Sequence, residues 1–412
     1  MNKPVRVGMV GAGQLARMTH QAAVDLGIEL SVLAKSPSDP AVLAGAKAVF
    51  GDYQDVNLLL EFAKNCDVVT FDHELVPYKA IHFLEENSIK VRPGSAAFMY
   101  SQDKLYARVK LQEAGFPVPA FTCMGEDDIN AINSFADKFS WPVVAKSRSG
   151  GYDGRGVWVI TNREVATEFF DNMKVRHGQS DEGHLDRNDQ DQKVMPEETE
   201  NFLTANSKNR FIIEEHVDIA KEIAILGVRR QNGQFLTYTP IETIQQNGIC
   251  NELFMPADIS ETLAADAKSL AAEIARHVRV IGLIAIEMFI TTEGKLIINE
   301  LALRPHNSGH ATIEASYTSQ FQNHLRAVLD WPLGSVEMKV PSAAMVNILG
   351  SKSLADPMAR IALLSDFPAI SVHMYAKEPV FGRKLGHVTA VGTDTKALLG
   401  AARQCAKQLV GE

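Results

Sequence analysis

Glu287 and Glu300 are the two residues whose type and spacing point most directly to chemistry. Each lies in a short apolar run, and Glu293-Gly294 separates the two runs. If Glu293-Gly294 forms a two-residue hairpin turn, the flanking strands pair so that Phe289 faces Ile298 and Glu287 faces Glu300. The sequence therefore predicts two carboxylates directly opposite each other on one face of a hairpin.

Two carboxylates in this arrangement repel each other, and the repulsion costs about 0.2–1 kcal/mol even at exposed positions. Inside a cleft the cost is larger, unless one group is protonated or a cation lies between them. Carboxylate oxygens suit Mg²⁺, which usually completes its shell with water and nucleotide phosphate oxygens. The pair thus indicates a metal–nucleotide site; the alternative is an exposed hairpin with two solvated glutamates.

The polar run from Arg304 to His310 follows this hairpin directly. It places a guanidinium four residues after Glu300, where it could neutralise charge on a transferring phosphoryl group. His306 and His310 have the i, i+4 spacing of a helical metal-binding pair. The proline and glycine within the run argue against a helix, so we do not expect these histidines to bind zinc.

The loop from Gly150 to Gly156 is rich in glycine and lies between two predicted strands, after Lys146 and Arg148. Glycines let backbone N–H groups approach a phosphate closely. The loop lacks the Gly-Lys-Ser/Thr of a Walker A motif. We interpret it as a phosphate lid, with a simple flexible hairpin as the alternative.

Gly11 to Gln14 follows the first strand and resembles part of a dinucleotide-binding fingerprint. No acidic residue ends the second strand, where Lys35 stands instead, so a dinucleotide is not favoured. We interpret the segment as a helix N-terminus that faces a small anion such as a sugar phosphate. The alternative is a turn with no ligand.

A second basic segment near the C-terminus contains Lys377, Arg383, Lys384 and His387, with glycines between them. This is a candidate phosphate-binding patch, and ordinary surface charge is the alternative.

The elements that must position these residues begin with a parallel, doubly wound sheet. Apolar strands at Val5–Val10, Glu29–Ala34 and Cys66–Phe71 alternate with a helical pattern at Leu15–Leu26, which predicts an α/β domain that ends near Pro93-Gly94. Further helices are expected at Gln102–Ala114, Leu263–His277 and Gln320–Leu329, with a terminal helix. Further strands are expected at Trp141–Lys146, Val157–Ile160, Arg210–Glu214, Glu222–Val228, Gln234–Thr239, Leu283–Ile290, Lys295–Leu301, Ala343–Leu349 and Ala369–Tyr375. Residues 176–208 are polar and lack periodicity, so we expect a solvated, mobile insertion.

The composition, 46% hydrophobic and 22% charged over 412 residues, is typical of a multi-domain globular protein. The net charge of −9 argues against a nucleic-acid partner. No apolar run reaches the roughly 20 residues of a membrane span, so no membrane partner is expected. The four cysteines are far apart, which favours a reduced cytoplasmic location.

Several motifs together resemble a known family. They are Gly13-Gln-Leu-x-Arg-Met, Gly150-Gly-Tyr-Asp-Gly-Arg-Gly, Asn299-Glu-Leu-Ala-x-Arg-Pro-His-Asn-Ser-Gly-His, Ser319-Gln-Phe-x-x-His-Leu-Arg-Ala and Gly382-Arg-Lys-x-Gly-His. The chain resembles the N5-carboxyaminoimidazole ribonucleotide synthases, ATP-grasp ligases of purine synthesis, over nearly its whole length. The resemblance implies an α/β ATP-grasp fold with an N-terminal Rossmann-like parallel-sheet domain (1–100), an ATP-grasp domain (101–340, lid about 120–215) and a small β-rich C-terminal domain (341–412).

The same resemblance implies that 5-aminoimidazole ribonucleotide, bicarbonate and ATP with Mg²⁺ (or Mn²⁺) give N5-carboxyaminoimidazole ribonucleotide, ADP and phosphate through carboxyphosphate. Glu287 and Glu300 would bind the metal, and Arg304, Lys146 and Asp153 would be catalytic. The implied ATP-binding residues are Lys104, Lys146, Gly151, Tyr152, Asp153, Gly154, Arg155, Gly156, Glu214, Glu215, His216, Val217, Glu222, Gln245, Asn299 and Glu300. The implied ribonucleotide-binding residues are Gln14, Leu15, Glu74, Tyr152, Asp153, Arg155, Arg304, Lys377 and Arg383.

The sequence departs from the family pattern at several positions. Leu303 replaces a usual proline, Lys104 a common arginine, Gln245 a frequent histidine, and Val380-Phe381 a usual Arg-Pro. The metal pair is retained, so we expect an active enzyme and, from the resemblance, a homodimer. The alternatives are a formate-dependent glycinamide ribonucleotide transformylase of the same fold, and a nucleotide-binding regulatory or dehydrogenase-like protein built on the Gly11 loop.

Overall fold

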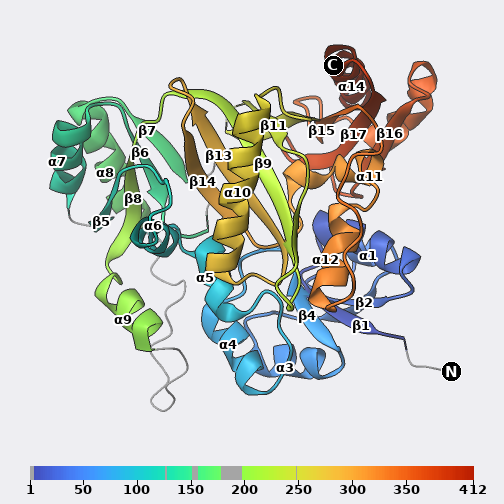
Figure 1. Cartoon of the computed structure of the whole chain (residues 1–412), viewed down its shortest axis with the longest axis horizontal. Coiled ribbons are helices and arrows are strands. Elements are labelled where there is room, and N and C mark those ends of the chain that lie inside the picture. Colours follow the sequence, from blue (N-terminus) through green and yellow to red (C-terminus); the bar gives the residue numbers. More distant parts are fainter. Residues whose placement is uncertain (1–3, 126–127, 151–155, 178–196, 247) are drawn as a thin grey trace.

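The structure is a computed structural model, described here for residues 4–125, 128–150, 156–177, 197–246 and 248–412. It contains three β-sheets, of four, four and nine strands, with helices packed around them (Figure 1). Among the described residues, no helix is both long enough and apolar enough to cross a membrane.

The first sheet is parallel, in the order β3-β2-β1-β4. Its strands are β1 (Arg6–Val10), β2 (Glu29–Ala34), β3 (Lys47–Phe50) and β4 (Val68–Phe71). The helices of this region are α1 (Gln14–Asp25), α2 (Pro40–Leu43), α3 (Val56–Lys64) and α4 (Tyr78–Glu86). The predicted parallel sheet is confirmed, although the sequence did not reveal β3, whose residues are mostly exposed and not uniformly apolar.

The second sheet is antiparallel, in the order β5-β8-β6-β7. Its strands are β5 (Phe121–Gly125), β6 (Val143–Ser147), β7 (Val157–Ile160) and β8 (Asn209–Glu215), and its helices are α7 (Ile129–Phe139), α8 (Arg163–His177) and α9 (Glu197–Ala205). Helix α9 falls within the polar segment in which the sequence predicted no regular element. That expectation was wrong for residues 197–205, because Phe202 gives the helix an apolar contact, edge-on against Tyr106. Residues 178–196 lie outside the described part.

The nine-stranded sheet runs in the order β14-β13-β9-β11-β12-β15-β17-β16, with β10 paired to β9. Its strands are β9 (Ile219–Arg229), β10 (Phe235–Thr237), β11 (Ile241–Gln246), β12 (Ile249–Met255), β13 (Gly282–Thr291), β14 (Leu296–Ala302), β15 (Ser342–Leu349), β16 (Ile370–Met374) and β17 (Lys384–Gly392). The strands of the C-terminal segment thus extend the central sheet through the β12–β15 pairing, which the sequence did not indicate.

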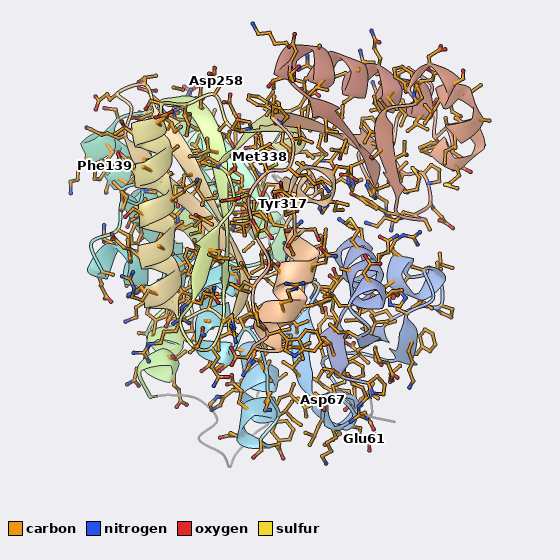
Figure 2. All side chains as sticks on the ribbon, turned by 45° about the vertical axis from the view of Figure 1, so that its right-hand side comes forward. Glu61, Asp67, Phe139, Asp258, Tyr317 and Met338 are labelled. Atoms are coloured by element: carbon orange, nitrogen blue, oxygen red, sulfur yellow. The ribbon has the colours of Figure 1, made fainter. Side chains whose placement is uncertain are left out.

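Helices α5 (Ser95–Gln102), α6 (Lys104–Glu113), α10 (Glu261–Val278), α11 (Thr312–Ala315), α12 (Gln320–Val328), α13 (Pro357–Arg360) and α14 (Thr395–Val410), with 3₁₀ helices η1 (Asn307–Gly309) and η2 (Ile361–Asp366), complete the fold. Helix α12 packs against α1 of the first domain, and Phe321 joins the hydrophobic core there. The segment before α12 is held in place because Ser316 forms an isolated β-bridge with Met338, and the Tyr317 N–H donates to the Glu337 carbonyl. Tyr317 and Met338 are labelled in Figure 2.

The hairpin that carries Glu287 and Glu300 differs from the prediction in its turn and in part of its register. The turn is longer than two residues: the Thr291 N–H donates to the Lys295 carbonyl, and Gly294 has a φ of 80°. Phe289 therefore faces Ile297, not Ile298. A β-bulge between Glu287 and Met288 then shifts the register by one residue, because Asn299 has no partner of its own. Glu287 faces Glu300 as predicted, although for a different reason.

Candidate active site

The opposed carboxylates lie at the edge of the central sheet, on β13 and β14. The Glu287 side chain is 21% exposed and the Glu300 side chain 45%. Burial, together with the charges of Glu300 and Glu222, raises the pKa of Glu287 to about 8. The nearby Lys104 ammonium lowers the pKa of Glu300 to about 2. At neutral pH Glu287 therefore holds a proton unless a further cation takes its place.

Two lysines approach the carboxylate pair from different elements. Lys104 Nζ lies 3.1 Å from Glu300 Oε2, and this attraction raises the pKa of the ammonium. Lys104 begins α6, whose N-cap is Asp103, and Arg148 Nη2 lies 2.6 Å from the Asp103 carboxylate. Lys146, on β6, donates to Asn299 Oδ1 over 3.1 Å. Both predicted phosphate-binding lysines thus lie beside the predicted metal pair.

A buried ion-pair network lies behind Lys146. Lys146 Nζ is 2.6 Å from Glu214 Oε2, and Arg108 Nε is 2.6 Å from Glu214 Oε1. The two cations outweigh the effect of burial and lower the pKa of Glu214 to about 2. Arg108 was not predicted as a site residue from the sequence. The available signal was its position one helical turn after Lys104 on a predicted helix.

Arg304 lies at the site, paired with the first domain. Its Nε donates to Glu74 Oε2 over 2.7 Å, and although burial opposes the charge, Glu74 and other carboxylates raise the pKa of the guanidinium. The preceding Leu303 is fully buried in a core cluster that spans the first and central sheets. The leucine side chain fills core volume at that position.

The loop after Arg304 is held by Gln320, the first residue of α12. The Gln320 side chain accepts from the His306 N–H over 2.9 Å and donates to the His306 carbonyl over 2.7 Å. His306 Nε2 then lies 3.7 Å from Glu287 Oε1. His310 instead stacks between Phe321 and His387 in the interior, so the two histidines do not form a metal pair. Within the described ranges, no group of three or more His, Cys, Asp or Glu is arranged to hold a metal ion.

Part of the helix N-terminus that follows Gly11 is occupied by a carboxylate of the chain itself. The Asp72 carboxylate accepts from the Gly13 N–H over 2.5 Å and from the Ala16 N–H over 3.2 Å. A carboxylate of the chain itself therefore occupies these two N–H groups, and a sugar phosphate bound elsewhere at this helix N-terminus stays a prediction. Leu15 is a core residue, so only its backbone could meet a substrate.

Two further pairs of predicted residues are brought together across the fold. The Gln14 side chain accepts a hydrogen bond from Lys377, which joins α1 to the C-terminal segment. Glu222 on β9 lies beside Gln245 on β11, and their hydrogen bond moderates the rise that burial causes in the Glu222 pKa.

The remaining predicted residues are less defined by contacts. Glu215, His216 and Val217 lie at or just after the end of β8, in the connection from the second sheet to the central sheet. In the C-terminal segment, Arg383 is exposed, whereas its neighbour Lys384 is buried. Gly156 follows the glycine-rich loop and accepts from the Ser147 N–H. Gly151, Tyr152, Asp153, Gly154 and Arg155 lie outside the described residues.

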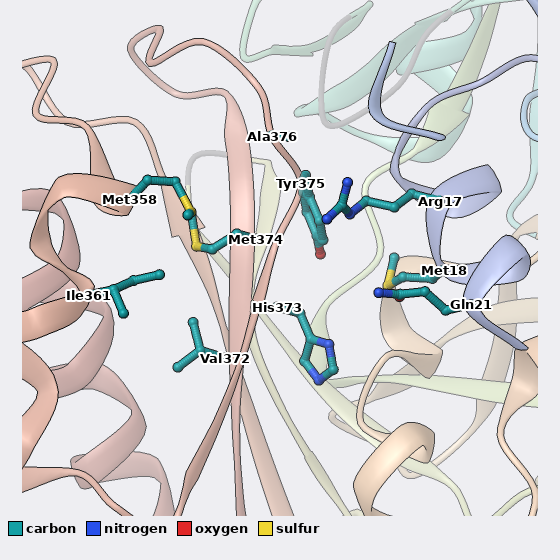
Figure 3. Close-up of a pocket in the computed structure, with 10 residues that line it drawn as sticks. All are labelled: Arg17, Met18, Gln21, Met358, Ile361, Val372, His373, Met374, Tyr375 and Ala376. Carbon is teal, nitrogen blue, oxygen red and sulfur yellow. The ribbon is translucent and has the colours of Figure 1, made fainter. Parts of the chain in front are cut away.

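A pocket of ≈ 490 Å³ lies apart from the carboxylates, between α1 and the C-terminal segment (Figure 3). Arg17, Met18 and Gln21 line it from α1, and residues 372–376 line it from β16 and the chain beyond. It contains neither glutamate, so it is not the metal–nucleotide site.

The antiparallel second sheet and the acidic edge of the central sheet, with lysines between them, are the arrangement of an ATP-grasp enzyme. A family model described as "ATP-grasp domain" matches residues 109–182 and 188–321, and one described as "Ribonucleotide synthetase preATP-grasp domain" matches residues 4–102. A third, "Phosphoribosylaminoimidazole carboxylase C-terminal domain", matches residues 343–400.

The chain belongs, within that class, to the N5-carboxyaminoimidazole ribonucleotide synthase family. It is 38% identical to the synthase of Mycobacterium tuberculosis over 98% of this chain and 87% of the relative. It is 34% identical to that of Corynebacterium ammoniagenes over 98% of this chain and 92% of the relative.

Solved structures of the family match over the same length. The Thermus thermophilus synthetase has a TM-score of 0.79 at 30% identity, covering 98% of this chain and 99% of the other. The Aspergillus clavatus synthase, in complex with ADP and 5-aminoimidazole ribonucleotide, has a TM-score of 0.83 at 26% identity, covering 99% of each chain.

Proposed function

We infer that this protein catalyses the ATP-dependent carboxylation of 5-aminoimidazole ribonucleotide by bicarbonate, giving N5-carboxyaminoimidazole ribonucleotide, ADP and phosphate in purine biosynthesis. The observation that carries the inference is the opposed Glu287–Glu300 pair beside Lys104 and Lys146, in a chain similar over almost its whole length to synthases of this reaction.

We propose that Glu287 and Glu300 hold Mg²⁺, or Mn²⁺ in its place. The donor set fits, because two hard carboxylates suit Mg²⁺ and the raised Glu287 pKa marks a position that lacks positive charge. The bound ion would neutralise the phosphate oxygens of ATP. Lys104 and Lys146 orient those phosphates, with Asn299 positioned by Lys146. Glu215 to Val217, Glu222 and Gln245 are proposed to contact the nucleoside, whereas the Glu214 side chain is already bound by Arg108 and Lys146.

The proposed reaction begins with attack of bicarbonate on the γ-phosphorus, which gives carboxyphosphate and ADP. Arg304 donates through Nε to Glu74 and through Nη1 to the Pro305 carbonyl, and its Nη2 group is proposed to stabilise the charge on that intermediate. The amine of the ribonucleotide then attacks the carboxyl carbon, the bond from that carbon to the phosphate oxygen breaks, and phosphate leaves. The amine loses a proton, for which Asp153 is the proposed acceptor. Gln14, Lys377 and Arg383 are proposed to bind the ribonucleotide, with Tyr152 and Arg155.

The decisive assay measures ADP release with aminoimidazole ribonucleotide plus bicarbonate, beside glycinamide ribonucleotide plus formate. Turnover is expected only with the first pair. Turnover with the second pair alone would establish the transformylase alternative, which the C-terminal match to a phosphoribosylaminoimidazole carboxylase domain does not favour.

We also propose the division into domains at 1–100, 101–340 and 341–412, a homodimer and a cytoplasmic location. The four cysteines are free thiols, which supports a reducing compartment. Light scattering on the purified protein tests the dimer, and a monomer at micromolar concentration would contradict it.

A further inference from the structure

Arg108 lies close to the candidate site but touches neither predicted metal ligand. It occupies the second turn of α6, and its side chain is only 3% exposed. Its Nε donates to Glu214 Oε1 over 2.6 Å, and its Nη2 donates to the carbonyl of Asn299 over 2.5 Å. A guanidinium this deeply buried needs such partners, because an unpaired buried charge costs several kcal/mol.

The Asn299 contact falls on the extra residue of the β-bulge. Without the bulge, the pairing of Phe289 with Ile297 would continue and Glu287 would face Asn299. Glu300 would then point to the opposite face of the sheet, because side chains alternate along a strand. The bulge is therefore what places the two carboxylates on the same face, and Arg108 binds the backbone at that point.

The contacts of Arg108 also close a ring of four residues. Arg108 binds Glu214, Glu214 binds Lys146, Lys146 binds the Asn299 side chain, and the Asn299 carbonyl returns to Arg108. Glu214 and Lys146 belong to the second sheet, whereas Asn299 belongs to the central sheet. The ring thus fixes the phosphate-binding lysine relative to the metal pair.

We propose that Arg108 is a positioning residue that holds the Asn299 bulge and Lys146 in place, and so sets the geometry of the metal–nucleotide site. This proposal rests on the proposed function of Glu287 and Glu300 as metal ligands. Planar geometry is required, because the guanidinium donates in two directions at once, to a side chain of one sheet and to the backbone of another. A lysine at this position keeps the charge but lacks that fork.

The test measures the Mg²⁺ concentration that gives half-maximal binding of ADP, by calorimetry, together with the melting temperature. Loss of partners that orient metal ligands typically costs 10–100-fold in metal affinity. We expect the Mg²⁺ midpoint of Arg108→Gln to rise roughly 10–100-fold, and that of Arg108→Lys to rise less. Glu214→Gln, which breaks the same ring from β8, is expected to shift the midpoint in the same direction.

Lys110→Gln is the matched control, because it removes a cation from the same helix. The ion pair that Lys110 makes with Glu113 is exposed on the glutamate side. The midpoint of this variant should equal that of the unmodified protein. A lower melting temperature with a midpoint within twofold of the unmodified protein, in whichever Arg108 variant folds, would show a merely structural role and overturn the proposal. If the unmodified protein binds MgADP but does not turn over aminoimidazole ribonucleotide, the proposed function fails while this test still stands.

Discussion

Replacement of Glu287 by glutamine should stabilise the metal-free protein while it abolishes activity. In the folded protein the pKa of Glu287 is about 8, whereas the ordinary value for a glutamate is 4.5. Between these two pH values the folded state holds one proton that the unfolded state has released. The free energy of unfolding therefore falls as pH rises through this window, by up to about 1.4 kcal/mol per pH unit.

Glutamine is nearly isosteric with the protonated acid and does not titrate, so Glu287→Gln does not lose this stability. The variant and the unmodified protein should be similar near pH 4.5. Between pH 4.5 and pH 8, the free energy of unfolding of the variant should rise relative to that of the unmodified protein, by a total on the order of a few kcal/mol. Its ADP release should be lost throughout, because a neutral amide cannot replace a metal-binding carboxylate.

The assay is urea unfolding of both proteins at pH 5, 6, 7 and 8, in EDTA and again with excess Mg²⁺ and ADP. The difference in unfolding free energy should grow with pH in EDTA. With the ligands, it should reverse, because only the unmodified protein is stabilised by binding. A pH-independent difference in EDTA would refute the argument that burial and the neighbouring carboxylates raise the pKa of Glu287. Full activity in the variant would refute the metal assignment.

Three further outcomes are expected. His324 is fully buried, accepts from the Leu283 N–H, and burial lowers its pKa to about 3. The free energy of unfolding should therefore fall by up to about 1.4 kcal/mol for each pH unit below 6.5. In urea unfolding, His324→Asn should reduce the pH dependence of this free energy by the contribution of one proton. Asp72→Ala removes the carboxylate that caps α1, and calorimetric unfolding should show a loss of about 1–2 kcal/mol, with no loss if water replaces the cap fully. Leu303→Ala should cost about 2–5 kcal/mol in the same measurement because it leaves a cavity in the core, and a cost under 1 kcal/mol would show that the core collapses to fill it.

Much of the fold could be predicted from the sequence, because strands and helices that bury one face carry a periodic pattern. The parallel strands β1, β2 and β4, the hairpin of β13 and β14, and helices α10 and α12 were all expected at nearly their observed positions. The C-terminal strands β15 and β16 were predicted individually, but the pairing of β15 with β12 was not. Strand order joins residues far apart in the chain, and no local pattern records it.

The candidate site divides in the same way. The residue types of the site could be recognised in the sequence, because carboxylates, lysines and an arginine are the side chains that suit a metal–phosphate site. The Gly11 segment shows the limit, since a free helix N-terminus and one capped by Asp72 have the same local sequence. The sequence placed Arg108 one helical turn after Lys104, but only the fold brought Glu214 and the Asn299 carbonyl beside its guanidinium.

The sequence by itself determined that two glutamates lie on adjacent strands of a hairpin, since turn residues and apolar alternation are local properties. Only the tertiary structure decided that they face each other: the longer turn shifts the register in one direction and the bulge at Asn299 shifts it back. A bulge depends on what binds its unpaired backbone, and here that group is a guanidinium from a helix nearly 200 residues earlier in the chain.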